Sequence, residues 1–294
     1  MSAKIPPPKA SLTPAVPSDL SFKRVLFWIA VGLVVCLSLA PVLWQVLTSF
    51  KVNADISKIP NVYLPTRLTL SHYAELLQRR PFGRYLFNSS LVAILSTLLC
   101  LGIGSPAAYA LARLRLRGEG LILAAVLIVT LFPYVLLFLG LLEIIQALQL
   151  ANNYLALIIP YTAINLPLTI LVMRSFFQQL PQDLEDAAKV DGYNTLQMLW
   201  YILLPTTLPT LVTTGILAFI FAWNEFVFAL TFITREGMKT IPVATAQIGG
   251  STVFEIPYGP IAAATVLGTL PLVVLVLFFQ GKIIQGLTEG AVKG

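Results

Sequence analysis

Long apolar runs separated by short polar segments dominate the hydropathy pattern of this chain. The first run follows Lys23 and Arg24 and ends near Leu47, and the others cover about 87–112, 121–142, 154–176, 206–231 and 258–281. Each run is long enough to cross ~30 Å of hydrocarbon as a helix. The alternation of period two that marks barrel strands is absent. Because backbone in lipid must satisfy its own hydrogen bonds, the pattern predicts an all-α polytopic membrane protein with about six transmembrane helices.

The composition supports a membrane protein and excludes several other classes. Charged residues make up 11% of the 294 residues, whereas a soluble domain carries about 25%. The net charge of +6 fits Lys and Arg beside membrane spans and requires no nucleic acid. Cys36, Cys100 and the single histidine, His72, form neither a disulfide framework nor a metal-ligand cluster. We therefore expect no metal site and no nucleic-acid partner.

The N-terminal 20 residues are polar and rich in proline, which predicts a disordered tail before a single membrane domain at 21–294. The first apolar run lacks the short length and cleavage site of a signal peptide, so we expect a retained helix. The short basic loop 113–120 predicts that this loop and both termini are cytoplasmic.

Three arginines in that basic loop, Arg113, Arg115 and Arg117, are interpreted as topology determinants or lipid head-group contacts. With this orientation, segment 50–86 is the longest external loop. Its basic residues run against the positive-inside rule, and the sequence offers no explanation for them.

Segment 177–205 gathers acids at an unusual density for so apolar a chain, namely Asp183, Glu185, Asp186 and Asp191. Pro181 suits a first helical turn, where the helix dipole favours negative charge. Gly192 can adopt a left-handed conformation after that helix. Asn194 or Thr195 can cap a second apolar helix that ends at Pro205. The segment therefore predicts a short helix, a glycine turn and a second helix that leads back into the membrane.

Two interpretations of the acidic segment remain open from physics alone. Ala187 and Ala188 lie with Leu184 on one side of the first helix, and the acids lie largely on the other. The alanines would let another surface approach closely, and the acids would orient a basic partner. A solvated loop with ordinary acidic capping explains the same composition.

The order of these residues resembles the EAA loop of ABC importer permeases. The loop is carried by the run Leu184-Glu185-Asp186-Ala187-Ala188, then Asp191-Gly192, then Leu204-Pro205. Asp186 stands where the family pattern has the glutamate of Glu-Ala-Ala. Further segments resemble the carbohydrate-uptake branch and its maltose-type G permease: Thr48–Lys51, Asn88-Ser89, 107–118, Trp223–Phe226 and Gly290–Gly294.

The resemblance implies a type I ABC importer permease fold in a prokaryotic inner membrane, surrounded by lipid. It implies a second related permease, a pair of ATPase subunits that hold ATP and Mg²⁺, an extracytoplasmic solute-binding protein and a sugar-like solute. No G-x-x-x-x-G-K-[ST] occurs in the sequence, so we expect this chain to be no enzyme and to hold no cofactor. The coupling contacts implied for the ATPase are those of the EAA loop together with Lys293 and Gly294 of the C-terminal tail.

Polar residues within the apolar runs are candidates for the solute path: Asn165, Trp223, Asn224, Glu225 and Gln247. Because a carboxylate in the bilayer is costly, Glu225 should face protein or water. We favour a structural interpretation for Trp223, Asn224 and Glu225, as interhelical hydrogen-bond partners. A place on the path, with Trp223 stacking on a sugar, is the alternative.

Two other classes of protein compete with the permease interpretation. A stand-alone secondary transporter would need coupling-ion residues near the midplane and usually internal repeats. Glu225 is a single such residue, which is too few for a convincing coupling-ion site. A membrane-bound enzyme would need clustered catalytic groups, which the sequence lacks outside the acidic segment.

Overall fold

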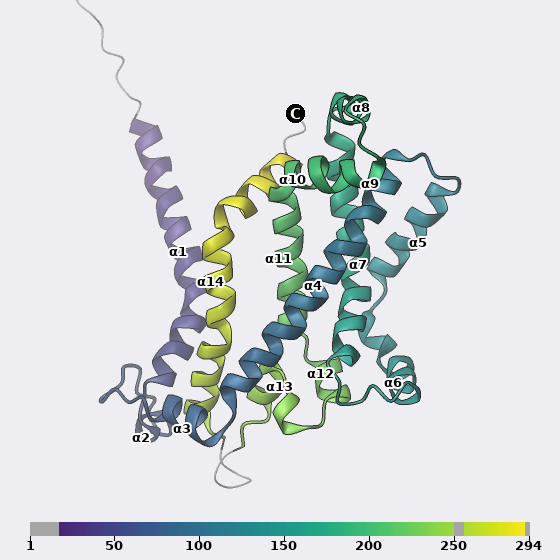
Figure 1. Cartoon of the computed structure of the whole chain (residues 1–294). Helices are drawn as coiled ribbons and strands as arrows, with labels where there is room; N and C mark the ends of the chain where they lie inside the picture. Colours follow the sequence, from purple (N-terminus) through teal and green to yellow (C-terminus); the bar gives the residue numbers. More distant parts are fainter. Residues whose placement is uncertain (1–17, 250–255, 292–294) are drawn as a thin grey trace, which may run out of the picture.

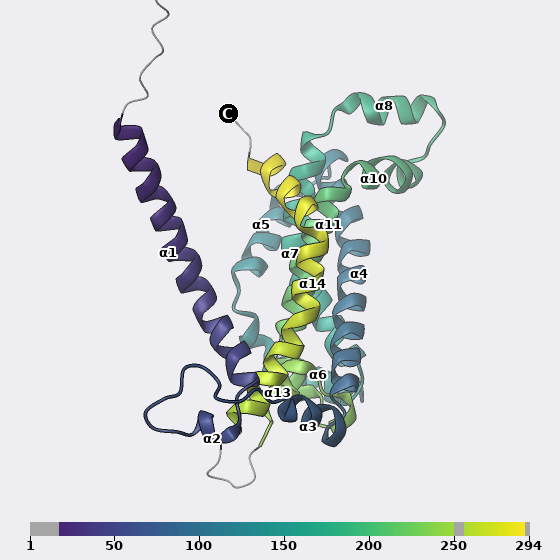
Figure 2. The same ribbon diagram turned by 90° about the vertical axis from the view of Figure 1, so that its left-hand side faces the viewer.

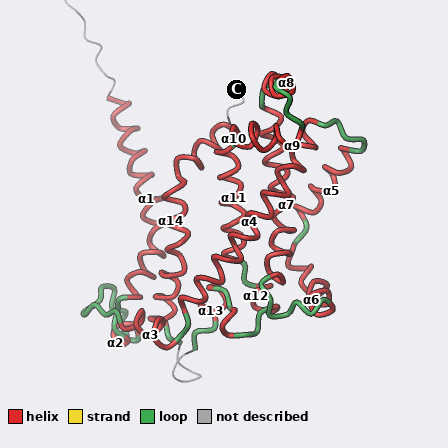
Figure 3. The backbone as a smooth tube through the Cα atoms, viewed as in Figure 1, coloured by secondary structure: helices red, strands yellow, loops and turns green. Residues whose placement is uncertain are grey.

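The chain folds as an elongated bundle of long helices with short helices at both ends (Figure 1). The structure is a computed structural model and describes residues 18–249 and 256–291. Most of the predicted N-terminal tail, and Lys293 and Gly294, lie outside the described residues. Within them the only extended pairing is a single antiparallel bridge between Lys51 and Leu68. Figure 3 shows helices and loops but no strand among these residues, so the predicted all-α class is confirmed.

The long helices run back and forth between two ends of the bundle (Figure 1). They are α1 (Ser18–Ser49), α4 (Phe82–Arg113), α5 (Glu119–Leu131), α7 (Leu155–Gln179), α11 (Leu208–Asn224) and α14 (Tyr258–Ala291). Four of these elements could each cross a membrane, and the described residues contain six crossings if each of two bent helix pairs counts as one.

Short elements define the two ends of the bundle (Figure 1). What we call the α8 end contains α8 (Gln182–Val190), α9 (Thr195–Met198), the π-helical turn η2 (Leu199–Leu203) and α10 (Leu204–Thr206). What we call the α3 end contains α2 (Asn53–Ile56), α3 (Ser71–Arg79), η1 (Tyr134–Leu137), α6 (Phe138–Ala147), α12 (Val227–Phe232), η3 (Glu236–Met238) and α13 (Ile241–Ala246). The start of α1 and the end of α14 both lie toward the α8 end.

The predicted continuous span at 121–142 is wrong. Helix α5 ends at Leu131, and the helical segment Tyr134–Ala147 continues at 91° to it. Pro133 explains the break, because proline lacks an N–H and disfavours helical geometry in the residue before it. Phe132 accordingly has extended backbone angles.

The predicted continuous span at 206–231 is also wrong. Helix α11 ends at Asn224, Glu225 is extended, and α12 begins at Val227. The Glu225 carboxylate accepts hydrogen bonds from the backbone N–H groups of Phe228 at 2.9 Å and Ala229 at 3.2 Å. It therefore satisfies donors at the start of α12 that would otherwise lack partners, and this compensates for the break.

Helices α4, α7 and α11 form the centre of the bundle, and small residues let them approach closely. A Cβ added at Gly104 of α4 would lie 2.7 Å from Thr169 Cγ2 of α7, closer than a normal van der Waals contact. Helix α1 lies at the other extreme, since none of its most apolar window is buried. It diverges from the bundle toward its N-terminal end (Figure 2).

The close approach at Gly104 gives a testable expectation for stability. Gly104→Ala should make the protein less stable than Gly102→Ala by about 1–3 kcal/mol, the usual cost of overpacking. A Cβ at Gly102 meets nothing within 4 Å, so this control carries the same gain in helix propensity without the clash. Thermal unfolding of both variants in detergent checks the difference, and equal melting temperatures would contradict the packing.

Candidate functional site

The acidic segment forms the predicted helix, glycine turn and second helix. Helix α8 begins directly after Pro181, and Gly192 has a left-handed φ of +82° just beyond its end, as glycine permits at low steric cost. Asn194 then caps α9, because its side chain accepts from the Gln197 N–H at 2.9 Å and the Gln197 side chain accepts from the Asn194 N–H at 3.0 Å. Local sequence thus determines the shape of the segment.

The two faces of α8 differ in chemistry. Asp183, Asp186 and Ala187 are exposed, and the only ion pair of Asp186 is a surface contact with Lys189 at 3.1 Å. Ala188 is buried in an apolar cluster formed with residues of α4, α7 and the second helix. The expectation that both alanines share one face is therefore corrected, and only Ala187 lies on the outward face.

Glu185 points into the protein, which corrects the expectation that it faces a basic partner. Its Oε1 atom lies 2.9 Å from Arg113 Nε, and its Oε2 atom accepts from the Tyr109 hydroxyl at 3.3 Å. Both charged side chains are only 11% exposed. The Arg113 guanidinium also donates to the backbone carbonyl of Leu180. The acids of this segment therefore divide into one internal anchor and three exposed carboxylates.

Arg113 was interpreted from the sequence as a topology determinant, and the structure assigns it a second role. Its ion pair with Glu185 joins the end of α4 to α8, although the two residues lie 72 positions apart in the sequence. No local pattern could have identified this pair. The pair makes α8 a platform that is fastened to a membrane helix.

An apolar surface adjoins the exposed carboxylates of α8. Val190, Tyr193 and Leu196 are exposed, and so is Pro205, whereas Leu204 is buried in the same apolar cluster as Ala188. Exposed apolar groups beside charges are typical of protein contact surfaces. The predicted residues of the EAA loop therefore lie together at the α8 end, as a braced platform with a mixed outward face.

A cavity of about 440 Å³ opens beside the break between α5 and η1. Asn165 of α7 lines it, as do Phe132, Tyr134 and Phe221. The Asn165 amide donates to the Tyr161 carbonyl at 2.8 Å. Sequence reasoning identified Asn165 but missed the three aromatic residues. The Phe-Pro pair at 132–133 was the available signal, since it interrupts an apolar run.

The other candidates for the solute path do not line this cavity. Trp223 is buried and donates from Nε1 to the Gly268 carbonyl of α14 at 3.1 Å, while Glu225 accepts from the Tyr161 hydroxyl of α7 at 2.5 Å. Both therefore make the interhelical hydrogen bonds that we favoured from the sequence. Asn224 is exposed and donates to Ile220 of its own helix, and Gln247 is exposed beside α13 at the α3 end.

Among the residues that the structure describes, no group of three or more His, Cys, Asp or Glu side chains is arranged to hold a metal ion.

The Arg113–Glu185 pair can be tested by local stability. Arg113→Met should expose the α8 amides to hydrogen exchange, because removing one partner of a buried ion pair costs about 3–5 kcal/mol. The double variant Arg113→Met/Glu185→Leu should recover much of the protection. Lys189→Met removes the exposed pair with Asp186 and should cost less than ~1 kcal/mol. Wild-type protection in Arg113→Met would show that the pair does not hold α8.

Comparison with known proteins identifies the family. Residues 101–289 match the family described as binding-protein-dependent transport system inner membrane component. The chain is 40% identical to the sulfoquinovosyl glycerol transport system permease protein SmoH of Agrobacterium fabrum, over 96% of this chain and 98% of that protein. It is 38% identical to the trehalose transport system permease protein SugB of Mycobacterium tuberculosis, over 92% and 99%. It is 40% identical to the trehalose/maltose transport system permease protein MalG of Thermococcus litoralis, over 92% and 98%.

A solved structure shares the fold. The crystal structure of a bacterial ABC transporter involved in the import of the acidic polysaccharide alginate matches with a TM-score of 0.76, over 92% of this chain and 99% of that chain, at 22% identity. The predicted ABC importer permease fold is therefore confirmed. This chain belongs to the family of binding-protein-dependent transport system inner membrane components, and it is a membrane permease rather than an enzyme.

Proposed function

We propose that this chain is the permease subunit of an ABC importer for a sugar or sugar-like polyol, and that α8 is the helix through which partner ATPase subunits drive it. The observation that carries this proposal is the braced platform at the α8 end. Its outward face offers carboxylates and apolar side chains, and its inward face is fastened to α4 by Arg113 and Glu185. A surface of this kind can receive a partner and pass its displacement to a membrane helix.

The proposed mechanism is alternating access. Closure of two ATPase subunits on ATP and Mg²⁺ displaces α8, and the ion pair carries the displacement to α4. Helix α4 packs along α7, so the three elements move as one unit. A second related permease supplies the opposite wall of the path. No cofactor is required in this chain.

The α8 end is proposed to face the cytoplasm, with both termini on that side of a prokaryotic inner membrane. Basic residues near this end support the orientation under the positive-inside rule: Arg113, Arg115, Arg117, Arg174 and Lys189. The α3 end then faces outward, toward the solute-binding protein on which the family depends.

The cavity beside Asn165 is the proposed part of the solute path. Aromatic faces next to a carboxamide suit a sugar, because sugars present apolar C–H faces and hydroxyl groups. The relatives named above transport sulfoquinovosyl glycerol, trehalose and trehalose/maltose. These solutes share a glycosidic unit, so we propose a glycoside or polyol as the solute of this chain. Oligosaccharides, glucosylglycerol and glycerol phosphate fall within this class.

A stand-alone secondary transporter fits less well. Such a protein needs an intramembrane carboxylate that can bind and release a coupling ion. Glu225 accepts three hydrogen bonds, from Tyr161, Phe228 and Ala229, and it thereby stabilises the start of α12. That structural role leaves Glu225 poorly suited to exchanging an ion.

The docking role of α8 gives a direct test. The double variant Asp186→Lys/Ala187→Trp should lower uptake by about tenfold or more, because it reverses a charge and adds bulk on the outward face. Gln179→Lys changes the charge at an exposed position of α7 near α8 and should leave uptake unchanged. The measurement is solute uptake in cells, together with recovery of a P-loop ATPase when the tagged chain is purified in mild detergent. Normal uptake in the double variant would refute docking on this face.

The solute path gives a second test with a matched control. Asn165→Leu should reduce uptake by about tenfold while ATPase recovery stays normal, because the cavity loses its carboxamide. Asn224→Leu removes an amide that hydrogen-bonds only within its own helix and should have little effect. Equal uptake by the two variants would place the path elsewhere.

A further inference from the structure

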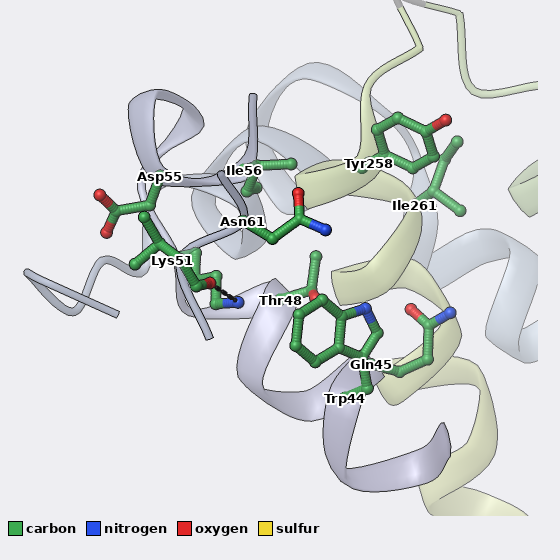
Figure 4. A pocket seen from close by; sticks show the side chains of 10 residues that line it. Trp44, Gln45, Thr48, Lys51, Asp55, Ile56, Asn61, Tyr258 and Ile261 are labelled. Carbon is green, nitrogen blue, oxygen red and sulfur yellow. Dashed lines mark hydrogen bonds between the residues drawn. The ribbon is translucent and has the colours of Figure 1, made fainter. Parts of the chain in front are cut away.

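A small polar pocket lies at the α3 end between α1, α14 and the segment that follows α1 (Figure 4). Trp44, Gln45 and Thr48 come from the last turns of α1, and Tyr258 comes from the first turn of α14. The pocket has a volume of about 220 Å³. Because these residues lie at the ends of two spans, the pocket lies at the level of the membrane surface, where aromatic residues gather.

Lys51 makes this pocket chemically unusual. Its side chain is only 2% exposed, and its ammonium donates to the Val62 carbonyl at 2.7 Å and lies 4.1 Å from the centre of the Trp44 ring. No carboxylate of the described residues lies within 4.0 Å of it. A buried ammonium has three donors and needs a counter-charge. Lys51 therefore has no carboxylate in direct contact among the described residues.

The nearest acid in the pocket wall is not in direct contact with the Lys51 ammonium. Asp55 accepts from the Thr66 backbone N–H at 2.8 Å and from the Thr66 hydroxyl. These hydrogen bonds, the backbone one foremost, lower the pKa of the Asp55 carboxyl, and the charges of Lys58 and Lys51 lower it further without forming an ion pair within 4.0 Å. The side chain is thus anchored to another part of the segment, and Figure 4 shows its carboxylate pointing away from the pocket.

Other polar groups in the pocket are also free to bind a ligand. The side chains of Gln45, Thr48 and Asn61 make no hydrogen bonds with the residues that the structure describes. Two carboxamides and a hydroxyl beside an ammonium are the donors that a phosphate group accepts from.

An apolar groove continues from the polar pocket into the membrane. It lies between α1 and α14, has a volume of about 320 Å³, and shares Gln45 with the pocket. Its lining reaches Val273, which is about 22 Å along α14 from Tyr258 at ~1.5 Å per residue. One leaflet of hydrocarbon is roughly 15 Å thick. The groove itself follows α14 from Thr265 to Val273, about 12 Å, so it can hold most of an acyl chain whose head group lies in the pocket.

We propose that the pocket and groove together bind one anionic phospholipid of the outer leaflet, with its phosphate at Lys51 and an acyl chain between α1 and α14. A polar, cationic recess that opens into an apolar groove matches an amphiphile, whereas a free anion would leave the groove unfilled. The site gives one basic residue of the external segment 50–86, Lys51, a counter-charge. It also supplies packing to α1, whose apolar window is not buried by the chain itself.

The test uses the intact transporter complex in detergent and native mass spectrometry. The probes are dioctanoyl phosphatidylglycerol, dioctanoyl phosphatidylcholine and glycerol phosphate. The complex should retain one phosphatidylglycerol in preference to the other two probes. Lys51→Met should weaken that binding by about tenfold, the loss expected for one charge-assisted contact. Lys58→Met, at an exposed position of the same segment, should leave it unchanged.

A second variant tests the proposal independently, in case Lys51→Met fails to fold. Thr269→Trp fills the apolar groove from α14 and leaves the ammonium in place, so it should also weaken binding of phosphatidylglycerol. Equal retention of phosphatidylcholine, or indifference to both variants, would mean non-specific lipid and would overturn the proposal. Equal, Lys51-dependent binding of glycerol phosphate would make this a site for soluble anions and would also overturn it. Retention of no lipid by the complex would also overturn the proposal.

Discussion

In hydrocarbon each backbone N–H and C=O must find a partner within the protein, and this constraint shapes every departure from straight helices in this chain. The described residues contain two sharply bent helix pairs, one at the break between α5 and η1 and one between α10 and α11, and a further break separates α11 from α12. Where α11 gives way to α12, Glu225 meets the demand with one carboxylate that accepts from two backbone N–H groups and a tyrosine hydroxyl. A residue that looks like a functional acid in the sequence is thus a structural cap.

The same cost of buried charge explains the architecture at both ends of the bundle. At the α8 end, Arg113 and Glu185 are nearly buried, and each is tolerated because the other is present. The pair fixes the platform to α4 and leaves the exposed carboxylates available outside. At the α3 end, the buried Lys51 ammonium contacts a carbonyl and an indole, and no carboxylate of the described residues forms an ion pair with it. The buried charges at the α8 end are therefore paired within the chain, whereas the buried ammonium at the α3 end is proposed to be paired with a ligand.

Large parts of the described surface of this chain are apolar. Helix α1 packs on α14 and otherwise presents apolar side chains outward. The cavity beside Asn165 opens at the surface of the bundle rather than being closed inside it. Exposed apolar area of this extent is expected for a chain whose helices are surrounded by lipid.

The sequence by itself determined the membrane class, the approximate position of each crossing, the family, and the helix, glycine turn and capped helix of the acidic segment. These features depend on hydropathy and on neighbours a few residues apart, as the left-handed Gly192 and the Asn194 cap illustrate. Only the tertiary structure decided that Glu185 faces inward to Arg113, that Trp223 is bound to α14, and that three aromatic residues surround Asn165. Those contacts join residues that are far apart in the chain, and no periodic pattern records which side chain will meet which across a packed interface.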